Sequence, residues 1–418
     1  MNDDSRGRGA GRLVLPAHIL GVLLLQATQN ACWFMLPVIA LKHFDAGKSQ
    51  MLVLTAAPTV LFVLSIFWND LFSRLSLGRF WLVYWVVAGL PQAGMGLAPS
   101  FAVLAVLAAM SSVGVSGYHP ASGELLKRLY GDRRRGRIYG VIQTASLLAG
   151  AGITWQMGRW LERDQDAFRW FLPAAAGAQL VGVGILWRLA HATGIEAKRA
   201  RATGEAWTLR RSFEPVLHTR EVLAGDRVFA RYEAAFMTYG VAWMICYALV
   251  PLIATERLGL GYEKVAESTH SPYQAALAAC MMPAGLLLDK LGPARTCGLA
   301  FVTLAIYPIG LILAGSADGL FAASVLYGIT HAGVSAAWML GPVALAPTPD
   351  KVPQYVAIHA TLVGLRGAVF QAAGVWLYAL TGSVTWSLVI AAVALVVAGW
   401  QMFALSGSIR RGVSGMKR

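Results

Sequence analysis

"GLLLDKLGPAR", residues 285–295, places an aspartate, a lysine and an arginine in a short stretch between two long apolar runs. The run before it covers residues 265–288 and the run after it covers residues 293–315. About 20 consecutive apolar residues are enough for a helix to cross a bilayer, so each run predicts a membrane span. The two runs therefore predict a helical hairpin whose charged turn lies in water.

The same alternation of apolar runs and polar connections extends along all 418 residues. The chain is 57% hydrophobic and 13% charged, whereas soluble domains carry roughly a quarter of charged residues. Twelve spans are predicted, at 13–43, 50–72, 80–97, 100–126, 136–161, 168–190, 228–258, 265–288, 293–315, 319–345, 353–380 and 385–405. We therefore expect an all-α integral membrane protein whose surroundings are the lipid bilayer.

The distribution of basic residues predicts the orientation of the chain. Twelve spans place both termini on one side, and 27 of the 35 lysines and arginines fall on that side. Seven fall on the opposite side, and Arg366 lies within a span. Basic loops stay in the cytoplasm, which predicts cytoplasmic termini, in the plasma (inner) membrane if the protein is bacterial. The net charge of +14 is thus an orientation signal, and no nucleic-acid partner is expected.

A charged stretch at residues 191–227 divides the chain into residues 1–190 and residues 228–418, with six predicted spans each. The two parts resemble each other internally, because CWFMLPVIA (32–40) aligns with CYALVPLIA (246–254). Secondary transporters are often built from two such repeats, with the binding site between them near mid-membrane. The sequence therefore predicts two parallel six-helix halves joined by a cytoplasmic linker.

The turn GLLLDKLGPAR resembles the G-x-x-x-D-[RK]-x-G-x-x-[RK] loop of the major facilitator superfamily. Gly285, Asp289, Lys290, Gly292 and Arg295 stand at its defining positions. The resemblance covers essentially the whole chain as architecture. It implies two six-helix halves around a central cavity and a gating role for these five residues.

The corresponding loop of the first half departs from this pattern. Ser73 and Ser76 replace the aspartate and the second glycine, while Arg74 and Arg79 keep their character. Asp70, one turn earlier, is a possible substitute carboxylate.

Asp289 is expected near the start of the fifth span, where Arg137 belongs to a run of arginines. A carboxylate there is favoured by the helix dipole and by the arginines. We hypothesise a clamp that forms in the outward-facing state and breaks in the inward-facing state. A basic loop that only sets the topology is the alternative.

A second, local resemblance concerns GYHPASGELLKRLYGDRRRGRIYG at residues 117–140. This stretch is similar to the region between the fourth and fifth spans of bacterial exporters of the fosmidomycin-resistance type. The antiporter signature expected in the fifth span is incomplete, because IQTASLLAGAGITWQMG lacks its proline. That motif therefore gives no support for proton-driven efflux.

Polar and aromatic residues recur at helical spacing on the spans that the resemblance places around the cavity, the first, fourth, seventh and tenth. The tenth span is the clearest case, with steps of three and four residues between such side chains. The candidate lining residues are Gln29, Asn30, Trp33, His119, Tyr239, Trp243, Tyr327, His331 and Trp338. Ordinary packing, or for His119 and also His359 a structural interhelical hydrogen bond, is the alternative role.

Arg366 lies about mid-way along the eleventh span, beside Gln371 and a stripe of glycines. A charged residue at the bilayer centre costs roughly 2.5–3.5 kcal/mol on insertion scales, so it points to function. No predicted span holds an Asp or Glu near its centre, and Glu233 lies near a span end. We therefore expect an anionic substrate group to balance Arg366. The alternative is that helix carbonyls, Gln371 and water solvate it, or that a carboxylate from a span end reaches it.

These features predict a secondary-active or facilitative transporter of a small or amphiphilic organic anion, acting as a monomer by alternating access. Facilitated diffusion, anion exchange and histidine-linked proton coupling remain open. A lipid or multidrug exporter of the same fold, or a non-transporting scaffold or sensor, is the alternative. No enzyme, metal or cofactor is expected, because metal spacing, a phosphate loop and a nucleophile elbow are absent from the sequence.

Overall fold

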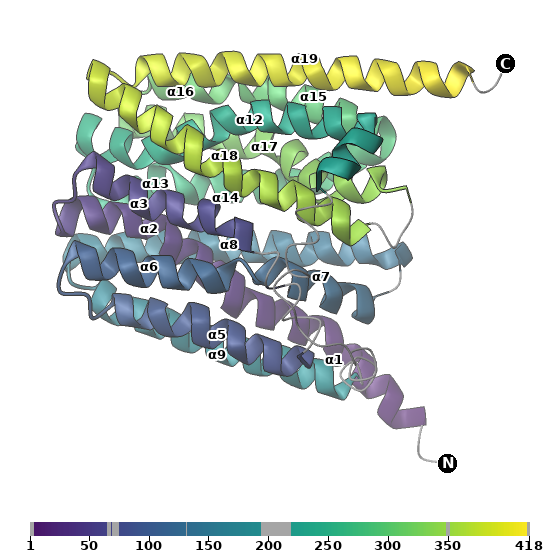
Figure 1. The fold of residues 1–418 in the computed structure, drawn as a ribbon. Helices are drawn as coiled ribbons and strands as arrows, with labels where there is room; N and C mark the ends of the chain where they lie inside the picture. The colour runs from purple at the N-terminus through teal and green to yellow at the C-terminus, as the bar shows by residue number, and fades with distance from the viewer. Residues whose placement is uncertain are drawn as a thin grey trace.

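The computed structural model of the protein describes residues 4–64, 68, 75–130, 132–193, 219–347 and 352–415, and these residues are almost entirely helical (Figure 1). Residues 194–218, most of the predicted linker, lie outside the described residues, as do Asp70 and Arg74. The side chains of His119 and Arg137 also lie outside the described part.

The helices of the first part of the chain form six rods. In chain order the rods are α1 (Asp4–Val22) with η1 (Leu23–Ala27) and α2 (Thr28–His43); α3 (Lys48–Val60) with η2 (Leu61–Leu64); α5 (Leu77–Met95); α6 (Phe101–Val115) with α7 (Tyr118–Leu129); α8 (Asp132–Arg163); and α9 (Phe168–Ala192). The short π-helix η1 interrupts the first rod, and such interruptions are frequent at functional sites.

Six further rods form the second part. They are α12 (Arg227–Leu252) with η3 (Ile253–Arg257); α13 (Tyr262–Ser268) with α14 (His270–Leu291); α15 (Pro293–Leu304) with α16 (Ile306–Leu313); α17 (Ala317–Leu345); α18 (Val352–Thr381); and α19 (Thr385–Gly415). Eight of the twelve rods contain helices long and apolar enough to cross a membrane, and two others contain shorter apolar helices. The prediction of an all-α membrane protein with twelve spans is confirmed.

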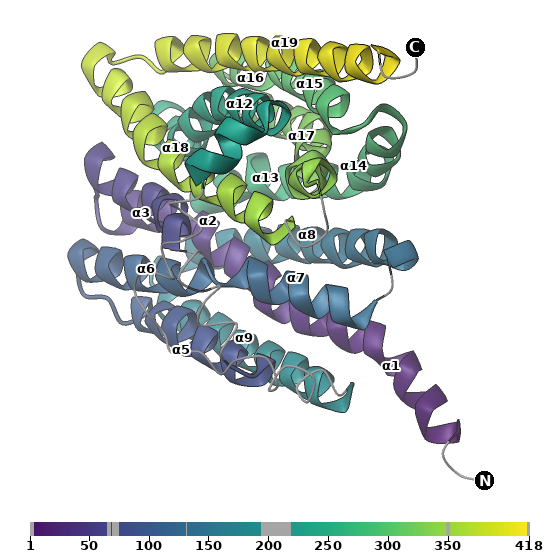
Figure 2. The ribbon, with the colours of Figure 1, turned by 45° about the vertical axis from the view of Figure 1, so that its right-hand side comes forward.

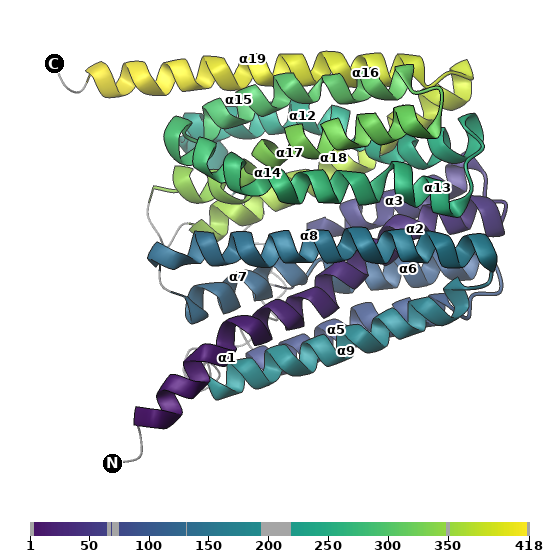
Figure 3. The ribbon, with the colours of Figure 1, turned by 180° about the vertical axis from the view of Figure 1, so that it is seen from behind.

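The two sets of six rods lie one above the other, and both termini lie at the same end of the bundle (Figure 1). The first half, coloured from purple through blue to the teal of α9, forms the lower layer, and the second half, whose colours run on to yellow at α19, forms the upper layer. The turned view keeps this division (Figure 2), and so does the view from behind (Figure 3).

Two seams hold the halves together. Along one seam α8 packs against α13 and α14, and along the other α18 packs against α3 and η2. Gly364 and Gly367 make the second seam possible, because a Cβ at either position would collide with Val63 or Thr59. The predicted small-residue stripe on the eleventh span thus lets a neighbouring helix approach closely.

Polar contacts close the seams at the end opposite the termini. Lys48 Nζ lies 3.2 Å from Glu256 Oε2, and Arg159 Nε lies 3.3 Å from Glu263 Oε1. Lys42 Nζ also donates to the carbonyl oxygen of Leu260 at 3.2 Å. Among the described side chains, every inter-half hydrogen bond and ion pair that we find lies at this end or at mid-depth. These contacts close this end of the bundle, and we call them the outer latch.

Candidate functional site

A cluster of aromatic side chains surrounds His331 of α17. The Tyr239 hydroxyl of α12 lies 3.0 Å from His331 Nε2, and the Tyr273 hydroxyl of α14 lies 3.0 Å from His331 Nδ1. Both ring nitrogens thus have a hydroxyl partner, one as donor and the other as acceptor, depending on the tautomer. This arrangement suits a neutral imidazole held in one orientation by two other helices.

Tyr327 of α17 is the second centre of this cluster. Its ring stacks between Tyr273 and Tyr307, with centroids 4.3 and 4.2 Å away. Its hydroxyl accepts a hydrogen bond of 2.8 Å from Trp243 Nε1. Trp243, Tyr273 and Tyr327 are only half-buried, so the cluster has an accessible side. We call Tyr239, Trp243, Tyr273, Tyr307, Tyr327 and His331 the aromatic–histidine cluster.

The cluster lies next to the seam between the halves. His270, one turn before Tyr273 on α14, stacks on Phe34 of α2 with centroids 4.2 Å apart. Gln274, the next residue after Tyr273, fills the space beside Gly150 of α8. The cluster therefore borders the boundary at which the two halves of the bundle meet.

Arg366 of α18 lies behind this cluster and is sealed from solvent. Its side chain is 2% exposed, and its Nη1 donates a hydrogen bond of 2.6 Å to the backbone oxygen of Phe236 on α12. The guanidinium carbon lies 5.6 Å from the Tyr239 ring centroid. Arg366 Nε has no hydrogen-bond partner among the described residues. Of the groups predicted to solvate Arg366, a helix carbonyl oxygen is the one that the structure shows bonded to it.

A buried carboxylate from near a span end stands close to Arg366, in line with the alternative that such a carboxylate reaches the guanidinium. Glu233 of α12 is 3% exposed, and both of its carboxylate oxygens lie 2.9 Å from Nδ1 of His359, which is 2% exposed. The Glu233 charge lies near enough to act on Arg366, although no hydrogen bond joins them. Glu233 is the seventh residue of α12 and so lies near a span end. Its side chain is nevertheless buried.

A capping interaction fixes α12 and α18 relative to each other. Asp226 Oδ1 accepts hydrogen bonds from the backbone N–H groups of Val228 and Phe229, which begins α12. Its Oδ2 accepts a hydrogen bond of 2.8 Å from the Tyr355 hydroxyl of α18. This contact sets the register in which Glu233 meets His359.

Two further predicted residues belong to the second half. Trp338 of α17 packs on His359 with ring centroids 5.3 Å apart, so it borders the pair that Glu233 forms with His359. Gln371 Nε2 donates a hydrogen bond of 2.8 Å to Thr59 Oγ1 across the seam. Gln371 is therefore a contact between the halves in this state.

The predicted residues of the first span lie on α2, in the other half. Asn30 is exposed, whereas Gln29 and Trp33 are buried. Neither amide atom of Gln29 has a hydrogen-bond partner in the described part of the chain. Among the described residues we find no hydrogen bond or ring contact between these three side chains and the aromatic–histidine cluster, although Trp33 belongs to the same buried core.

The predicted gating loop connects α14 to α15 at the end that holds the termini. Gly292 has φ of 77°, a conformation that glycine adopts without strain. Asp289 and Lys290 are exposed, Gly285 and Arg295 are half-buried, and among the described side chains Asp289 forms no ion pair. Arg79 of the first-half loop is exposed at the start of α5. The clamp hypothesis stays a prediction.

Within the described residues, no group of three or more His, Cys, Asp or Glu side chains is arranged to hold a metal ion. Sequence reasoning placed Tyr239, Trp243, Tyr327 and His331 correctly on shared faces, and the structure brings these four together. It missed Tyr273 and Tyr307, because their spans were not expected to line the cavity. The one signal for Tyr273 was its polar surroundings in HSPYQ, residues 270–274.

Comparison with solved structures shows the same fold. A POT family transporter in complex with 5-aminolevulinic acid superposes with a TM-score of 0.73 at 13% identity, covering 94% of this chain and 96% of that one. A bacterial homologue of the human lysosomal transporter Spinster, inward-facing and unoccupied, gives 0.66 at 15% identity, covering 96% and 98%. The human organic anion transporter MFSD10 gives 0.67 at 15% identity, covering 94% and 99%.

No curated protein matches the sequence. The sequence model of the Major Facilitator Superfamily matches residues 19–348, most of the chain. Two six-helix halves with a polar and aromatic site beside their seam agree with that match. The chain therefore belongs to the Major Facilitator Superfamily.

Proposed function

We propose that this protein transports a small or amphiphilic organic anion by alternating access, with Arg366 supplying the positive charge. The observation that carries the proposal is the position of the guanidinium. It is buried 5.6 Å from the centroid of the Tyr239 ring, and no carboxylate among the described residues is bonded to it. The hydroxyl of the same tyrosine belongs to the half-open aromatic–histidine cluster.

The cluster offers an anion complementary chemistry. The rings of Trp243 and Tyr327 give flat apolar surfaces, and the tyrosine hydroxyls can donate hydrogen bonds to anionic oxygens. A cation one ring away acts strongly on such an anion, because charges in a low-dielectric interior are weakly screened. Arg366 therefore anchors the anion either through the Tyr239 layer or directly, once Tyr239 moves aside.

The closed outer latch suggests which state of the transport cycle the structure represents. With cytoplasmic termini, as the distribution of basic residues predicts, the latch faces outward and the protein is in an inward-facing state. The exposed Asp289 agrees with a clamp that is broken in that state. Alternating access would then require the latch to open and the clamp to form.

Uptake by proteoliposomes tests the proposal. Labelled organic anions of graded size, from benzoate and benzenesulfonate to alkyl sulfates, should include at least one that wild type carries. Arg366→Gln should lower that uptake by roughly 10- to 150-fold, the usual effect of losing a hydrogen bond to a charged group. Arg366→Lys should recover part of it, since the charge is kept and the planar fork is lost.

Folding needs a control, because Arg366→Gln leaves Glu233 buried without its neighbouring cation. The double variant Arg366→Gln, Glu233→Gln removes both charges and should restore the melting temperature without restoring uptake. Wild-type uptake by this double variant would exclude Arg366 as the anchor. Failure of wild type to carry any anion of the series would overturn the proposed function.

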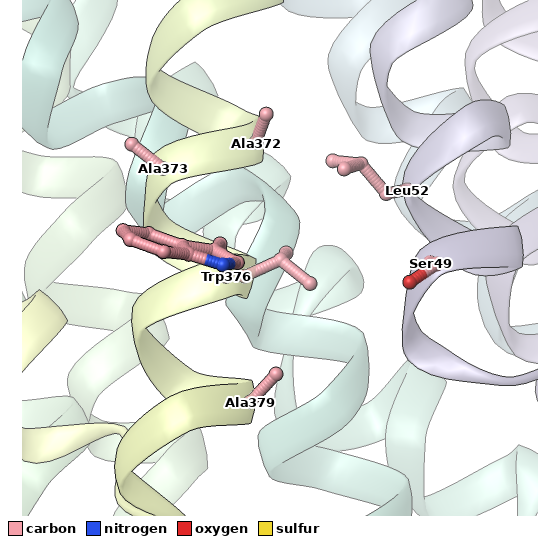
Figure 4. A pocket seen from close by; sticks show the side chains of 7 residues that line it. Ser49, Leu52, Ala372, Ala373, Trp376 and Ala379 are labelled. Carbon is pink, nitrogen blue, oxygen red and sulfur yellow. The ribbon is translucent and has the colours of Figure 1, made fainter.

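A lipid or multidrug exporter is the second candidate, and one recess favours it. Ser49 and Leu52 of α3 face Ala372, Trp376 and Ala379 of α18 across an apolar pocket at the seam (Figure 4). Trp376 is 66% exposed, as expected of a side chain that meets lipid. Competition of long-chain alkyl sulfates or phospholipids with the transported anion, weakened by Ala372→Phe, would favour this candidate.

A further inference from the structure

Most rings of the aromatic–histidine cluster lie nearly parallel to one another. The planes of Tyr239 and Trp243 differ by 14°, and each of them differs from the plane of His331 by 18°. The ring of Tyr327 lies within 28° of His331 and within 15° of Tyr273. The residues of two helices, α12 and α17, thus share one ring orientation.

A second aromatic cluster, in the first half, is packed differently. The planes of Trp68 and Phe80 meet at 81°, those of Phe80 and Trp81 at 75°, and those of Trp81 and Tyr84 at 79°. Edge-to-face packing of this kind is one of the two arrangements that aromatic side chains prefer, and here it fills a closed core. The parallel rings around His331 are therefore a feature of that site and not of aromatic packing throughout the protein.

Two hydrogen bonds hold the parallel rings by their edges. The Tyr239 hydroxyl lies 3.0 Å from His331 Nε2, and Trp243 Nε1 donates a hydrogen bond of 2.8 Å to the Tyr327 hydroxyl. The indole N–H is the one polar group of a tryptophan side chain, so the polar edge of Trp243 is already used. What Trp243 can offer to a ligand is the face of its ring.

That face has no stacked ring on it among the described side chains. The stacked pairs around Tyr327 have centroids 4.2 and 4.3 Å apart. The ring nearest to Trp243 is that of Tyr247, at 6.1 Å and tilted by 38°, and the rings of Tyr239 and His331 lie 6.5 Å away. Trp243 is also half-exposed. One further flat ring can therefore join the parallel set at Trp243.

We propose that the transported anion carries an aromatic ring, which stacks on the face of Trp243 while its anionic group points toward Tyr239 and Arg366. The inference rests on the proposed function and names the class of its substrate, the aryl carboxylates and sulfonates. Trp243 and Tyr239 are one turn apart on α12, about 5.4 Å along the helix, so one small molecule reaches both. The guanidinium carbon of Arg366 lies 5.6 Å beyond, measured from the Tyr239 ring centroid.

Paired ligands of equal charge test the aromatic requirement. Benzenesulfonate and cyclohexanesulfonate have the same charge and ring size, but only the first is flat and has a π-system. An aromatic pair gains about 0.5–1.5 kcal/mol beyond the burial of area, so purified wild type should bind benzenesulfonate about 2- to 12-fold more tightly. Calorimetric titration measures both affinities. If wild type accepts only carboxylates, benzoate and cyclohexanecarboxylate, both ionised near pH 7, form the pair.

Three variants locate the preference at Trp243. Trp243→Phe keeps an aromatic face and should keep most of the preference, whereas Trp243→Leu keeps only apolar bulk and should bring the ratio of the two affinities close to one. Tyr327→Phe removes the hydroxyl that holds the indole N–H, so the ratio should fall between those of wild type and Trp243→Leu. Each ratio is measured on one preparation, so it does not depend on the fraction of folded protein. If Trp243→Leu binds neither ligand, wild type and Trp243→Phe decide.

Trp85 of α5 provides a matched control in the first half. It is half-buried like Trp243, and its Nε1 likewise donates a hydrogen bond of 2.8 Å, to the backbone oxygen of Ala176. Trp85→Leu should keep the ratio of wild type. An equal loss of preference in Trp85→Leu and Trp243→Leu would overturn the assignment of Trp243.

The outcome with wild type separates this inference from the proposed function. Equal binding of the two ligands, tighter binding of the saturated one, or binding of alkyl sulfates alone would overturn the aromatic class and leave a transporter of organic anions. If wild type binds no anion of the graded series, the proposed function fails and the aromatic class fails with it.

Discussion

The side chain of Arg366 crosses α12 at Gly240, where a Cβ would collide with it. A Cβ built on Gly240 would overlap Cδ of Arg366, which continues on to donate its hydrogen bond to the oxygen of Phe236. The lack of a side chain at Gly240 of α12 thus determines the position of the Arg366 guanidinium of α18.

Gly240→Ala should displace Arg366. Overpacking in a tight core typically costs about 1–3 kcal/mol, so the melting temperature should fall and uptake should decline as in Arg366→Gln. Gly152→Ala is the control, because a Cβ at Gly152 of α8 meets nothing within 4 Å. Thermal unfolding and proteoliposome uptake measure both effects. Equal behaviour of the two variants would contradict this account of Gly240.

Glu256→Gln should loosen the outer latch. It removes the ion pair between Glu256 and Lys48, in which both side chains are about one third exposed. It also weakens the hydrogen bond that Tyr378 donates to Glu256. Exposed pairs contribute about 0.2–1 kcal/mol, so the population open at this end should rise by a factor of about 1.4 to 5. Distances between spin labels on the two halves measure the change.

Asp166→Asn is the control for the latch. It breaks the contact between Asp166 and Arg169, an ion pair within one half, and should leave the distances between the halves unchanged. A shift of equal size in this variant would show that any lost surface charge opens the protein.

Tyr273→Phe should disturb the orientation of His331. The variant loses the 3.0 Å contact to His331 Nδ1 but keeps the ring that stacks on Tyr327. Loss of one hydrogen bond usually costs about 0.5–1.5 kcal/mol, and uptake should fall with it. Tyr307→Phe keeps its stacking on Tyr327 and should leave both stability and uptake near those of wild type. Comparable losses in the two variants would point to general packing defects.

Asp289→Asn should leave the state seen here intact and impair the opposite state. Asp289 is exposed and unpaired among the described side chains, so the free energy of unfolding should change by no more than about 0.5 kcal/mol. The rate of uptake should fall, and labelling of single cysteines from the cytoplasmic side should increase. Unchanged uptake and unchanged labelling would refute the clamp.

The sequence was sufficient for the helices and for one half of the site. Hydropathy predicts the twelve spans, and steps of three and four residues place Tyr327 and His331 on one face of α17. Facing residues on α12, Tyr239 and Trp243, follow from the same spacing. These predictions succeed because periodicity within a single helix fixes which side chains share a face.

The residues that contact Arg366 could not be predicted from periodicity within one helix. Periodicity gives the depth of a residue in the membrane but not the neighbour that crosses it, so neither Gly240 nor the Phe236 oxygen could be anticipated. Glu233 was assigned to a span end by its position along α12, although the packing of α18 buries it against His359. Contacts between helices depend on rotation and crossing angle, which one sequence does not specify.

The outer latch also has a consequence for the medium in which the protein works. The ion pairs of Lys48 with Glu256 and of Arg159 with Glu263 remain partly in contact with water, so dissolved ions weaken them. The Debye length shortens from about 30 Å at 0.01 M to about 8 Å at 0.15 M ionic strength. A dilute medium would therefore hold this end of the bundle shut more firmly than a saline one, and the salinity at this end would tune how readily the two halves separate there.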